Sequence, residues 1–455
     1  MSTPRLRVVE VGAGWGVGGT EQAIEIRAAL LDRSSFDVHV VGLHAGPRFE
    51  RLAERGVSTV HLKGDTARLG SVLRELSPHL VHYSRPERVC PFSQLVQAAC
   101  REQSVPVVVE TNVFGRPPSW AQTRPPDITV HMSLASMLRA ARLVASDLPT
   151  LRATGHRVVY LPVPTPGGYR TAPEASREEA RARLGIAPHE LLACRVTRPD
   201  LRKWSPRLEA ALPQLFDAIP TLRFAFMAPP REKRAHLMSR HGSRILCLDT
   251  ESDLARVQAL YAASDLMVHS SGIGESFGLS MAEAMAAGLP VVADSTPDMD
   301  NAQVELIEHE RTGFIVRSSA GFVDAVRALA ADSGLRKRMG AAGAERAAER
   351  FADRRVVTQW QRLYADACAR AGIEIPPALV TGTPPVPSEE EYQTFPRHYA
   401  SACERALGRE PTPLEAARIS WIRARDVLGY ARTLGPKAVW RVVSSRLRSG
   451  SLDRD

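Results

Sequence analysis

Two glutamates that stand eight positions apart offer the most informative chemistry in this sequence. Glu275 precedes a glycine-containing turn, and Glu283 falls inside the helix predicted to follow it. Because a helix rises only about 1.5 Å per residue, the two carboxylates cannot meet at one point and should contact different parts of a long ligand. The backbone N–H groups of the turn are suited to a phosphate between them.

Two cations upstream could neutralise such a phosphate. Arg198 and Lys203 come just after a predicted strand, in the segment RPDLRK. Parallel sheets bind ligands in the crevice at the carboxyl ends of their strands, so both side chains are expected there. A diphosphate leaving group needs its charge neutralised, and without a metal ion Arg and Lys must supply that charge.

A glycine-rich loop, VGAGWGVGGT at residues 11–20, separates the first predicted strand from its helix. Glycines let the backbone approach a phosphate closely, and Gly14, Gly16 and Gly19 also satisfy the dinucleotide pattern G-x-G-x-x-G. That alternative needs an acid about 20 positions later, at the end of the second strand. The second strand ends in VGLH and Asp37 precedes it. NAD binding is therefore disfavoured, and a tight turn without a ligand remains an alternative.

Together these residues resemble the retaining GT-B glycosyltransferases of family 4. The family's E-x7-E hallmark is matched by Glu275 and Glu283 within ESFGL and EAMAAGLPVVA, and its R-x4-K pair by Arg198 and Lys203. The likeness covers roughly residues 5–370 and is strongest over 190–320.

Two further segments are similar to the same family. AQVELIEHERTGFIV at 302–316 resembles the family's segment around a further glutamate, here Glu305. Gly18-Gly19-Thr-Glu resembles its donor-side loop. Each motif alone is weak, and their joint occurrence is specific.

The resemblance implies a role for each matched residue. Glu275 would hydrogen-bond the hydroxyls of the donor sugar, and Glu283 would hold the nucleotide ribose. Arg198 and Lys203 would grip the diphosphate and stabilise its departure. Further donor contacts are expected from Gly18, Gly19, Ser276, Phe277, Gly278 and Leu279.

The first domain departs from the family pattern. The family carries a His after the strand that we predict at Val105–Val109, whereas this chain has Glu110-Thr-Asn112 there. Asn112 could hold a sugar hydroxyl in place of that His, without acid–base capacity. His131, after a later strand, is the second candidate for a sugar contact, with a purely structural role as its alternative.

The sequence also contains a pattern typical of metal-dependent transfer. Asp298-Met-Asp300 forms the D-x-D pattern that binds a metal–diphosphate in the other main transferase architecture. Two acids in a polar loop are common, and no other ligand cluster accompanies them. We therefore expect no metal and no cofactor, the nucleotide sugar being a substrate.

These roles predict a retaining, metal-independent transfer of a hexose from a nucleotide-diphosphate sugar to a glycan or lipid-linked acceptor. No side-chain nucleophile is evident, which favours front-face transfer through an oxocarbenium-like state. The leaving phosphate would take the acceptor proton, as the family resemblance implies. The alternatives are a GT-B phosphorylase or epimerase, a catalytically impaired nucleotide-sugar-binding protein and a dehydrogenase.

The elements that must position these residues alternate between strands and helices, which predicts parallel sheets. The fold class is α/β, with two facing Rossmann-like domains, a deep inter-domain cleft and a helical C-terminal extension. We assign residues 1–165 to the acceptor domain and 166–350 to the donor domain. A helix at 351–375 returns towards the first domain, within a helical stretch predicted at Gly340–Ala371, and a proline-rich linker and basic extension occupy 376–455.

Composition limits the remaining classes. The 455 residues are 44% hydrophobic, carry a net charge of +9 and contain no apolar run long enough for a transmembrane helix. The first residues lack the features of a signal peptide, and six scattered cysteines fit a reducing compartment, so we expect a cytoplasmic protein.

The positive charge fits an anionic ligand or a membrane surface. Nucleic acid is disfavoured because no zinc-finger or RNP-type motif occurs. Residues 414–448 combine an apolar helical stripe with many arginines, which predicts peripheral contact with the inner face of a membrane. Helices that pack this stripe on the enzyme are the alternative.

Overall fold

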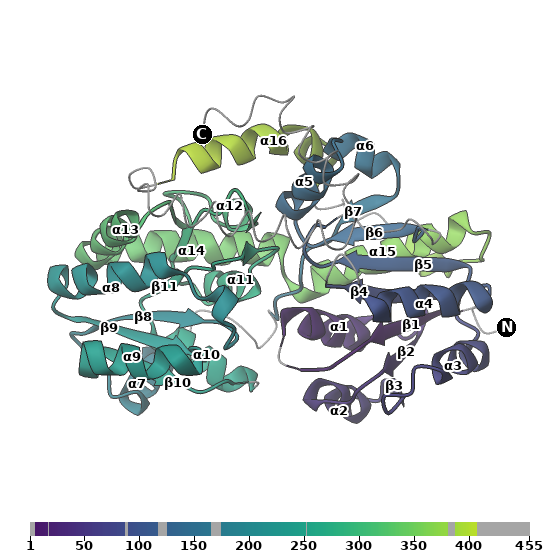
Figure 1. Ribbon diagram of the computed structural model, residues 1–455, viewed down its shortest axis with the longest axis horizontal. Coiled ribbons are helices and arrows are strands. Elements are labelled where there is room, and N and C mark those ends of the chain that lie inside the picture. Colours follow the sequence, from purple (N-terminus) through teal and green to yellow (C-terminus); the bar gives the residue numbers. More distant parts are fainter. Residues whose placement is uncertain are drawn as a thin grey trace.

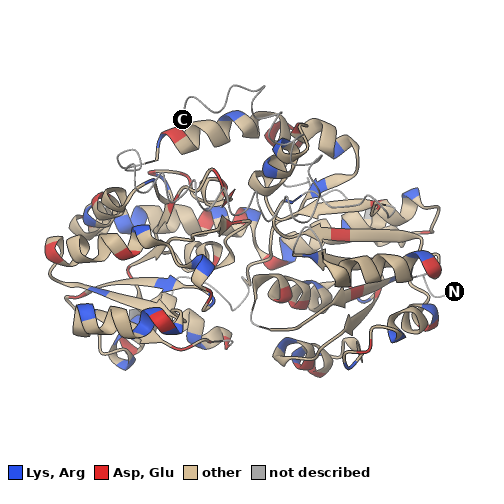
Figure 2. Cartoon of the chain, in the orientation of Figure 1, with Lys and Arg blue, Asp and Glu red and all other residues tan. Residues whose placement is uncertain are grey.

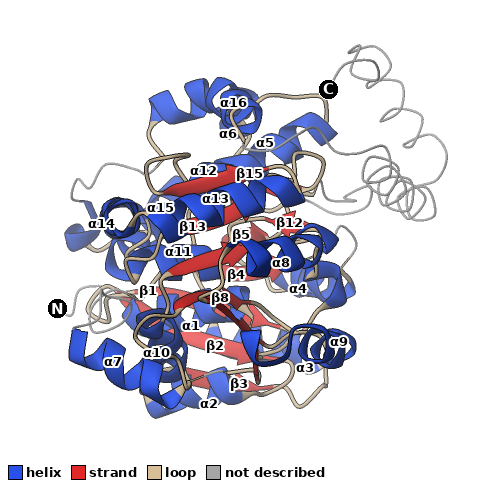
Figure 3. Ribbon diagram, turned by 90° about the vertical axis from the view of Figure 1, so that its left-hand side faces the viewer, coloured by secondary structure: helices blue, strands red, loops and turns tan. Residues whose placement is uncertain are grey.

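The computed structural model describes residues 5–16, 18–86, 90–116, 125–164, 174–251, 253–380 and 387–406. Within these ranges the chain forms two α/β domains side by side, each with helices on both faces of a parallel sheet (Figures 1 and 3). The predicted linker residues 166–168 and the basic segment 414–448 lie outside the described residues.

The first domain is built on a parallel sheet of seven strands within the described ranges. Its inner strands read as apolar runs, such as LRVVEVG, because helices cover both of their faces. In spatial order the strands are β3 (Ser58–His61), β2 (Phe36–Gly42), β1 (Leu6–Gly12), β4 (Leu80–Arg85), β5 (Val107–Asn112), β6 (Ile128–His131) and β7 (His156–Val158).

The second domain repeats this arrangement with a parallel sheet of six described strands and a separate two-stranded ribbon. The sheet runs in the order β10 (Ile245–Leu248), β9 (Leu222–Met227), β8 (Leu191–Val196), β11 (Leu266–His269), β13 (Val291–Asp294) and β15 (Gly313–Val316). The ribbon pairs β12 (Gly274–Glu275) with β14 (Asp300–Asn301).

Both sheets place their first strand in the middle, where the order of strands reverses. β1 lies between β2 and β4, and β8 lies between β9 and β11. Ligands of such folds bind outside the carboxyl ends of the strands at this reversal. The glycine loop follows β1 and the Arg198–Lys203 segment follows β8, so the topology brings both motifs to these two points.

Helices flank each sheet. Those of the first domain are α1 (Gly19–Leu30), α2 (Pro47–Glu54), α3 (Arg68–Leu76), α4 (Pro91–Glu102), α5 (Leu134–Leu143) and α6 (Leu148–Ala153). Those of the second are α7 (Glu174–Arg183), α8 (Pro206–Ala218), α9 (Arg231–His241), α10 (Leu254–Ala263), α11 (Leu279–Ala286), α12 (Gln303–Leu306), α13 (Ser319–Ala331) and α14 (Ser333–Arg350). Then come α15 (Asp353–Arg370) and α16 (Glu389–Glu404). The structure thus confirms the predicted class of two Rossmann-like domains with a helical C-terminal part.

The helical stretch predicted at Gly340–Ala371 is divided between two helices. α14 ends at Arg350 and α15 begins at Asp353, and the break lets the chain cross back to the first domain. At the break Val163 N donates to Phe351 O at 2.8 Å, and Asp353 N donates to Val163 O at 3.0 Å. The alanine-rich sequence favours helix throughout, so a long-range backbone contact decides where the helix stops.

The sequence also misplaced several strands. β5 begins at Val107 and runs through Asn112, so Asn112 lies in the strand and not after it. The edge strands β3 and β7 were not predicted, because short, half-exposed edge strands carry no continuous apolar run. Among the described helices, none has both the length and the apolar character needed to cross a bilayer.

α15 is fastened to the first domain by a buried ion pair. Arg27 Nε and Nη2 of α1 donate to the two carboxylate oxygens of Glu10 at 2.6 and 2.7 Å, and Tyr364 OH of α15 donates to Glu10 Oε1 at 3.0 Å. Burial alone would raise the pKa of Glu10, but Arg27 and His82 lower it well below its ordinary value. Glu10 is therefore ionised inside the core, where it joins β1, α1 and α15.

We expect Glu10→Gln to destabilise the fold by about 3 kcal/mol, because it leaves the buried Arg27 guanidinium without its counter-charge. The measurement is chemical denaturation. The control is Asp249→Asn, which breaks a pair with Arg234 whose Asp249 side chain is 91% exposed and should change stability by less than about 0.5 kcal/mol. Equal destabilisation by the two variants would contradict the structural role of Glu10.

Candidate functional site

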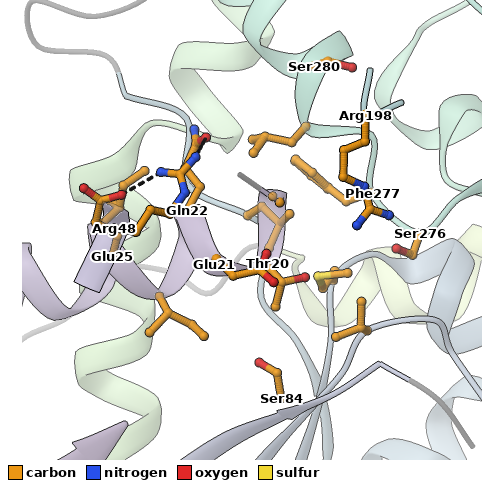
Figure 4. Close-up of a pocket in the computed structure, with 18 of the residues that line it drawn as sticks. Thr20, Glu21, Gln22, Glu25, Arg48, Ser84, Arg198, Ser276, Phe277 and Ser280 are labelled. Atoms are coloured by element: carbon orange, nitrogen blue, oxygen red, sulfur yellow. Dashed lines mark hydrogen bonds and ion pairs between the residues drawn. The ribbon is translucent and has the colours of Figure 1, made fainter. Parts of the chain in front are cut away.

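A cavity of about 1170 Å³ lies between the two domains. Its walls come from the loop after β1, the start of α1, the segment after β8, the β12 ribbon and the start of α11. Figure 4 shows side chains of α1 on one side, with Arg198, Phe277 and Ser276 on the other. Charged residues of both signs occur on both domains (Figure 2).

Glu275 is held on this wall by two cationic or polar partners. Lys203 Nζ donates to both of its carboxylate oxygens at 2.7 and 2.6 Å, and His269 Nε2 lies 3.0 Å from Oε1. The residue is only 7% exposed. Burial by itself would raise the pKa of Glu275, but the Lys203 ammonium and His269 together outweigh burial and lower the pKa to about 2. The carboxylate is therefore ionised and accepts hydrogen bonds.

A short 3-10 turn, Leu201–Lys203, aims Lys203 at Glu275. Asp200 caps the turn, its side chain accepting from Arg202 N at 2.9 Å. The buried Arg195 holds the end of the turn, since its Nη2 donates to Lys203 O at 2.7 Å and to Ser270 O at 2.9 Å. The turn is thus held at its start by Asp200 and at its end by Arg195, and this fixes the backbone from which Lys203 reaches Glu275.

Arg198 lies at the start of the same segment and is exposed on the cavity wall. Its side chain extends beside Phe277 towards Ser276 (Figure 4). Arg198, Lys203 and Glu275 therefore line one cavity, which is necessary if all three are to contact the same diphosphate sugar.

The turn after Glu275 begins α11 on the same wall. Gly278 is its N-cap residue with φ +93°, a left-handed conformation that favours glycine. The first N–H groups of a helix lack intrahelical acceptors, and Gly278, Leu279 and Ser280 all line the cavity. This end of α11 therefore suits an anion.

Glu283, inside α11, lies on the cavity wall and is only 5% exposed. Gln22 Nε2 of α1 donates to Glu283 Oε1 at 3.0 Å, and Tyr261 OH donates to Oε2 at 3.4 Å. The first contact crosses between the domains. Glu275 and Glu283 thus contact different side chains along the same cavity wall.

The first domain contributes Gly18 and Gly19 to the wall. Gly18 is the N-cap residue of α1, and Gly19 is its first residue. A Cβ atom at Gly19 would lie 3.3 Å from Leu279 Cδ2, so the two helix starts approach each other closely here.

The structure does not bring Asn112 or His131 to the cavity wall. Asn112 is 1% exposed, and its side chain bonds the backbone O and N of Arg116 at 2.9 and 3.2 Å. His131 is fully buried, and its Nε2 lies 2.9 Å from His156 Nδ1. Burial, together with the charges of His156 and Arg85, lowers the pKa of His131 well below its ordinary value. Both side chains have structural partners, which their position in sequence could not indicate.

The two acids of the D-x-D pattern occupy different environments. Asp298 is exposed, whereas Asp300 is buried in β14 and forms an ion pair with Arg139 of α5. Burial raises the pKa of Asp300, and Arg139 opposes that rise. The contact with Arg139 ties the second-domain ribbon to the first domain.

Glu305 joins the domains away from the cavity wall. Its carboxylate accepts from Leu134 N at 3.1 Å and Ala135 N at 2.9 Å, at the start of α5, and from Tyr160 OH at 2.7 Å. A carboxylate at a helix N-terminus is stabilised by the helix dipole.

Three residues of the site escaped the sequence analysis: His269, Arg195 and Gln22. His269 and Arg195 stand at or near the carboxyl ends of β11 and β8, a position that could have identified them. Gln22 carried no signal, because its partner Glu283 is 261 positions away.

A model of the family described as glycosyl transferases group 1 matches residues 193–332. N-acetyl-alpha-D-glucosaminyl L-malate synthase of Bacillus anthracis is 34% identical over 27% of this chain and 31% of its own length. D-inositol 3-phosphate glycosyltransferase of Streptomyces bingchenggensis is 30% identical over 44% of this chain and 45% of its own. This chain thus spans less than half the length of either of these relatives.

Solved structures extend the likeness to both domains. Anabaena Alr3699/HepE in complex with UDP-glucose superposes with a TM-score of 0.66 at 19% identity, covering 80% of this chain and 100% of that one. A Rickettsia africae glycosyltransferase gives 0.66 at 15% identity, covering 80% and 98%. At these identities the likeness shows the fold alone, and this fold is GT-B, as the motifs predicted.

The Lys203–Glu275 contact predicts a pH dependence. A carboxylate with a depressed pKa stabilises the fold above its ordinary pKa of 4.5, and this stabilisation is lost as the pH falls to about 2. We therefore expect the stability difference between the native chain and Glu275→Gln to shrink as the pH falls through this window in denaturation experiments.

The control compares Lys203→Met with the double variant Lys203→Met, Glu275→Gln in the same denaturation experiment. Without the ammonium, burial raises the pKa of Glu275 and only His269 opposes that rise, so the carboxylate should stabilise the fold less at neutral pH than it does beside Lys203. A difference that does not vary with pH in the native background would contradict the ion pair.

Proposed function

We propose that this chain is a retaining hexosyltransferase that uses a nucleotide-diphosphate sugar and no metal ion. The observation that carries the proposal is the ion pair between Lys203 and Glu275 inside the inter-domain cavity, with Arg198 on the same wall. The same cavity is lined by Gly18, Gly19 and Glu283. One cavity thus presents cations, free helix N–H groups and two separated carboxylates, the set that a diphosphate sugar requires.

The comparisons support the donor assignment. The matched family region, residues 193–332, covers the part of the second domain that holds Arg198, Glu275 and Glu283. The relatives that match are named as glycosyltransferases or synthases of sugar conjugates. We assign the donor to the second domain, with Glu275 accepting hydrogen bonds from the sugar hydroxyls and Glu283 from the ribose.

Departure of the diphosphate is assisted by the cations and helix N–H groups of the cavity. Negative charge gathers on the leaving diphosphate as the glycosidic bond breaks, and Arg198, Lys203 and the N–H groups at the start of α11 meet that charge in place. Closure of the domains around both substrates excludes water from the reaction. The Lys203 ammonium has three N–H groups, so it can donate to the diphosphate and still keep a hydrogen bond to Glu275.

We infer front-face transfer with retention. Two carboxylates of the donor wall are engaged by cations, Glu275 by Lys203 and Asp300 by Arg139, which disfavours either as a nucleophile. The acceptor hydroxyl attacks the face that the diphosphate leaves, and the leaving phosphate oxygen takes its proton.

The acceptor is assigned to the first-domain end of the cavity. This end is formed at the carboxyl ends of the first sheet by Ser84, Val113, Phe114, Arg116 and Met132. A polar hydroxyl, an apolar wall and one cation suit a glycan or a lipid-linked acceptor.

We expect Lys203→Ala and Glu275→Ala to lose transfer by about a hundredfold or more, the scale seen when one transition-state contact is removed. The donor is first identified by thermal shift with UDP, GDP and ADP sugars, since a ligand of the folded state raises Tm. Transfer is then measured with that donor across an acceptor panel.

Lys233→Ala is the matched control. Lys233 also contacts a glutamate, Glu209 at 2.7 Å, but it lies outside the cavity wall, so transfer should persist. Native turnover in Lys203→Ala or Glu275→Ala would refute the assignment. Binding of a nucleotide sugar by the native chain without turnover would favour a binding protein, and release of sugar phosphate would favour a phosphorylase.

Peripheral membrane contact is proposed for residues 414–448. We expect full-length protein to co-sediment with anionic vesicles and a chain that ends at residue 406 to stay in solution, because the truncation removes the basic segment and keeps α16. Addition of salt should release the bound protein. Equal partition of both chains would end the membrane proposal.

A further inference from the structure

Helix α16 lies across the two domains, near α5 and α6 of the first and α12 of the second (Figures 1 and 3). It begins at a capping box in which Ser388 and Glu391 exchange hydrogen bonds. Tyr392, Phe395 and Tyr399 recur at helical spacing and are buried, so one face of α16 is part of the core. The helix is therefore an integral part of the folded enzyme.

One end of α16 is fixed to the first domain. Tyr392 OH accepts from Val158 N at 2.9 Å, which satisfies a backbone donor of the edge strand β7. The guanidinium of Arg152, on α6, lies 4.3 Å from the centre of the Tyr392 ring and forms an ion pair with Glu389.

The other end of α16 is fixed to the second domain. Arg317 Nε donates to Ala406 O at 2.9 Å, just past the helix. Tyr399 OH accepts from Asn301 Nδ2 at 3.1 Å. Arg142 of α5 lies 5.2 Å from the Tyr399 ring, so this tyrosine contacts both domains.

Asn301 connects Tyr399 to the strand that carries Glu275. It stands in β14 directly opposite Glu275 in β12, and the next residue, Ala302, donates its N–H to Glu275 O at 2.8 Å. Thr296 N donates to Asn301 Oδ1 at 2.8 Å. On the other side, Asn301 Nδ2 donates to Tyr399 OH at 3.1 Å and also to Ser295 Oγ at 3.2 Å and Cys403 Sγ at 3.5 Å.

The ribbon has little freedom to adjust. Gly274 has φ +69°, and a Cβ atom there would lie 1.6 Å from Asp300 O, so β12 and β14 are in direct backbone contact. A shift of Asn301 therefore moves the backbone that carries the Glu275 carboxylate.

We propose that Tyr399 is a positioning residue for transfer, and that α16 is the brace through which it holds the β12–β14 ribbon and Glu275 in place. The role of Glu275 in transfer rests on the proposed function, whereas the contacts from Tyr399 to the ribbon stand independently of it. Burial raises the pKa of Tyr399 to about 12, so its phenol stays neutral across the working pH range.

The test is Tyr399→Phe, which removes one hydroxyl and keeps the ring. Amide hydrogen exchange of residues 274–276 and 300–302 should become several-fold faster, and kcat should fall about three- to tenfold, the scale of one lost hydrogen bond. A merely structural role would lower Tm and leave kcat per folded molecule unchanged. In Asn301→Ala, the further change Tyr399→Phe should have no additional effect on kcat, because both act through one contact.

Tyr392→Phe is the matched control, since it removes the same group from the same helix at the first-domain end. It should change kcat and the exchange of the ribbon much less than Tyr399→Phe does, because Tyr392 contacts β7 and not the ribbon. The proposal is overturned if Tyr399→Phe leaves the exchange of the ribbon unchanged, or if Tyr392→Phe alters the ribbon and kcat equally.

Hydrogen exchange is measured without donor, which separates this proposal from the function proposed above. Faster exchange of the ribbon in Tyr399→Phe of a chain that transfers no sugar would support the brace and refute the transferase. Unchanged exchange in a chain that does transfer sugar would refute the brace alone.

Discussion

The buried contact between Lys203 and Glu275 is the interaction on which the rest of the site depends. It joins the turn after β8 to β12 of the two-stranded ribbon, two segments that reach the same cavity after different strands of the second sheet, β8 and β11. A carboxylate that is 7% exposed is costly to keep ionised without a counter-charge. The ammonium removes that cost and leaves the carboxylate an acceptor, while the carboxylate fixes the ammonium where a leaving diphosphate would need it.

Each side of this contact is supported by buried polar groups that do not themselves bind the proposed donor. Arg195 holds the backbone of the Lys203 turn, and His269 bonds the Glu275 carboxylate. Preorganised charge is effective in catalysis because nothing has to reorient as the reaction proceeds.

The sequence predicted the fold, and it located the second-domain residues that share the cavity, because both signals are local. Arg198 and Lys203 follow β8 within seven residues, Glu275 ends β12, and Glu283 lies in the helix that begins four residues later. The first domain was harder, since Asn112 and His131 end the strands β5 and β6, yet their buried side chains bond Arg116 and His156 and not the cavity. Whether a polar side chain faces the cleft or the core depends on tertiary contacts that no local pattern records.

Polar contacts between residues far apart in the sequence determine the geometry of the cleft. Such contacts could not be predicted, because no local sequence pattern relates their two partners. Gln22 to Glu283, Glu305 to the start of α5, and Asp300 to Arg139 each cross between the domains. Any ribose hydroxyl that binds Glu283 must share it with Gln22 or replace Gln22. If the proposed donor site is correct, occupation of that site and the spacing of the domains are linked thermodynamically, because one carboxylate serves both. Contacts away from the cavity, such as that of Glu305, then hold the domains together while Glu283 changes partners.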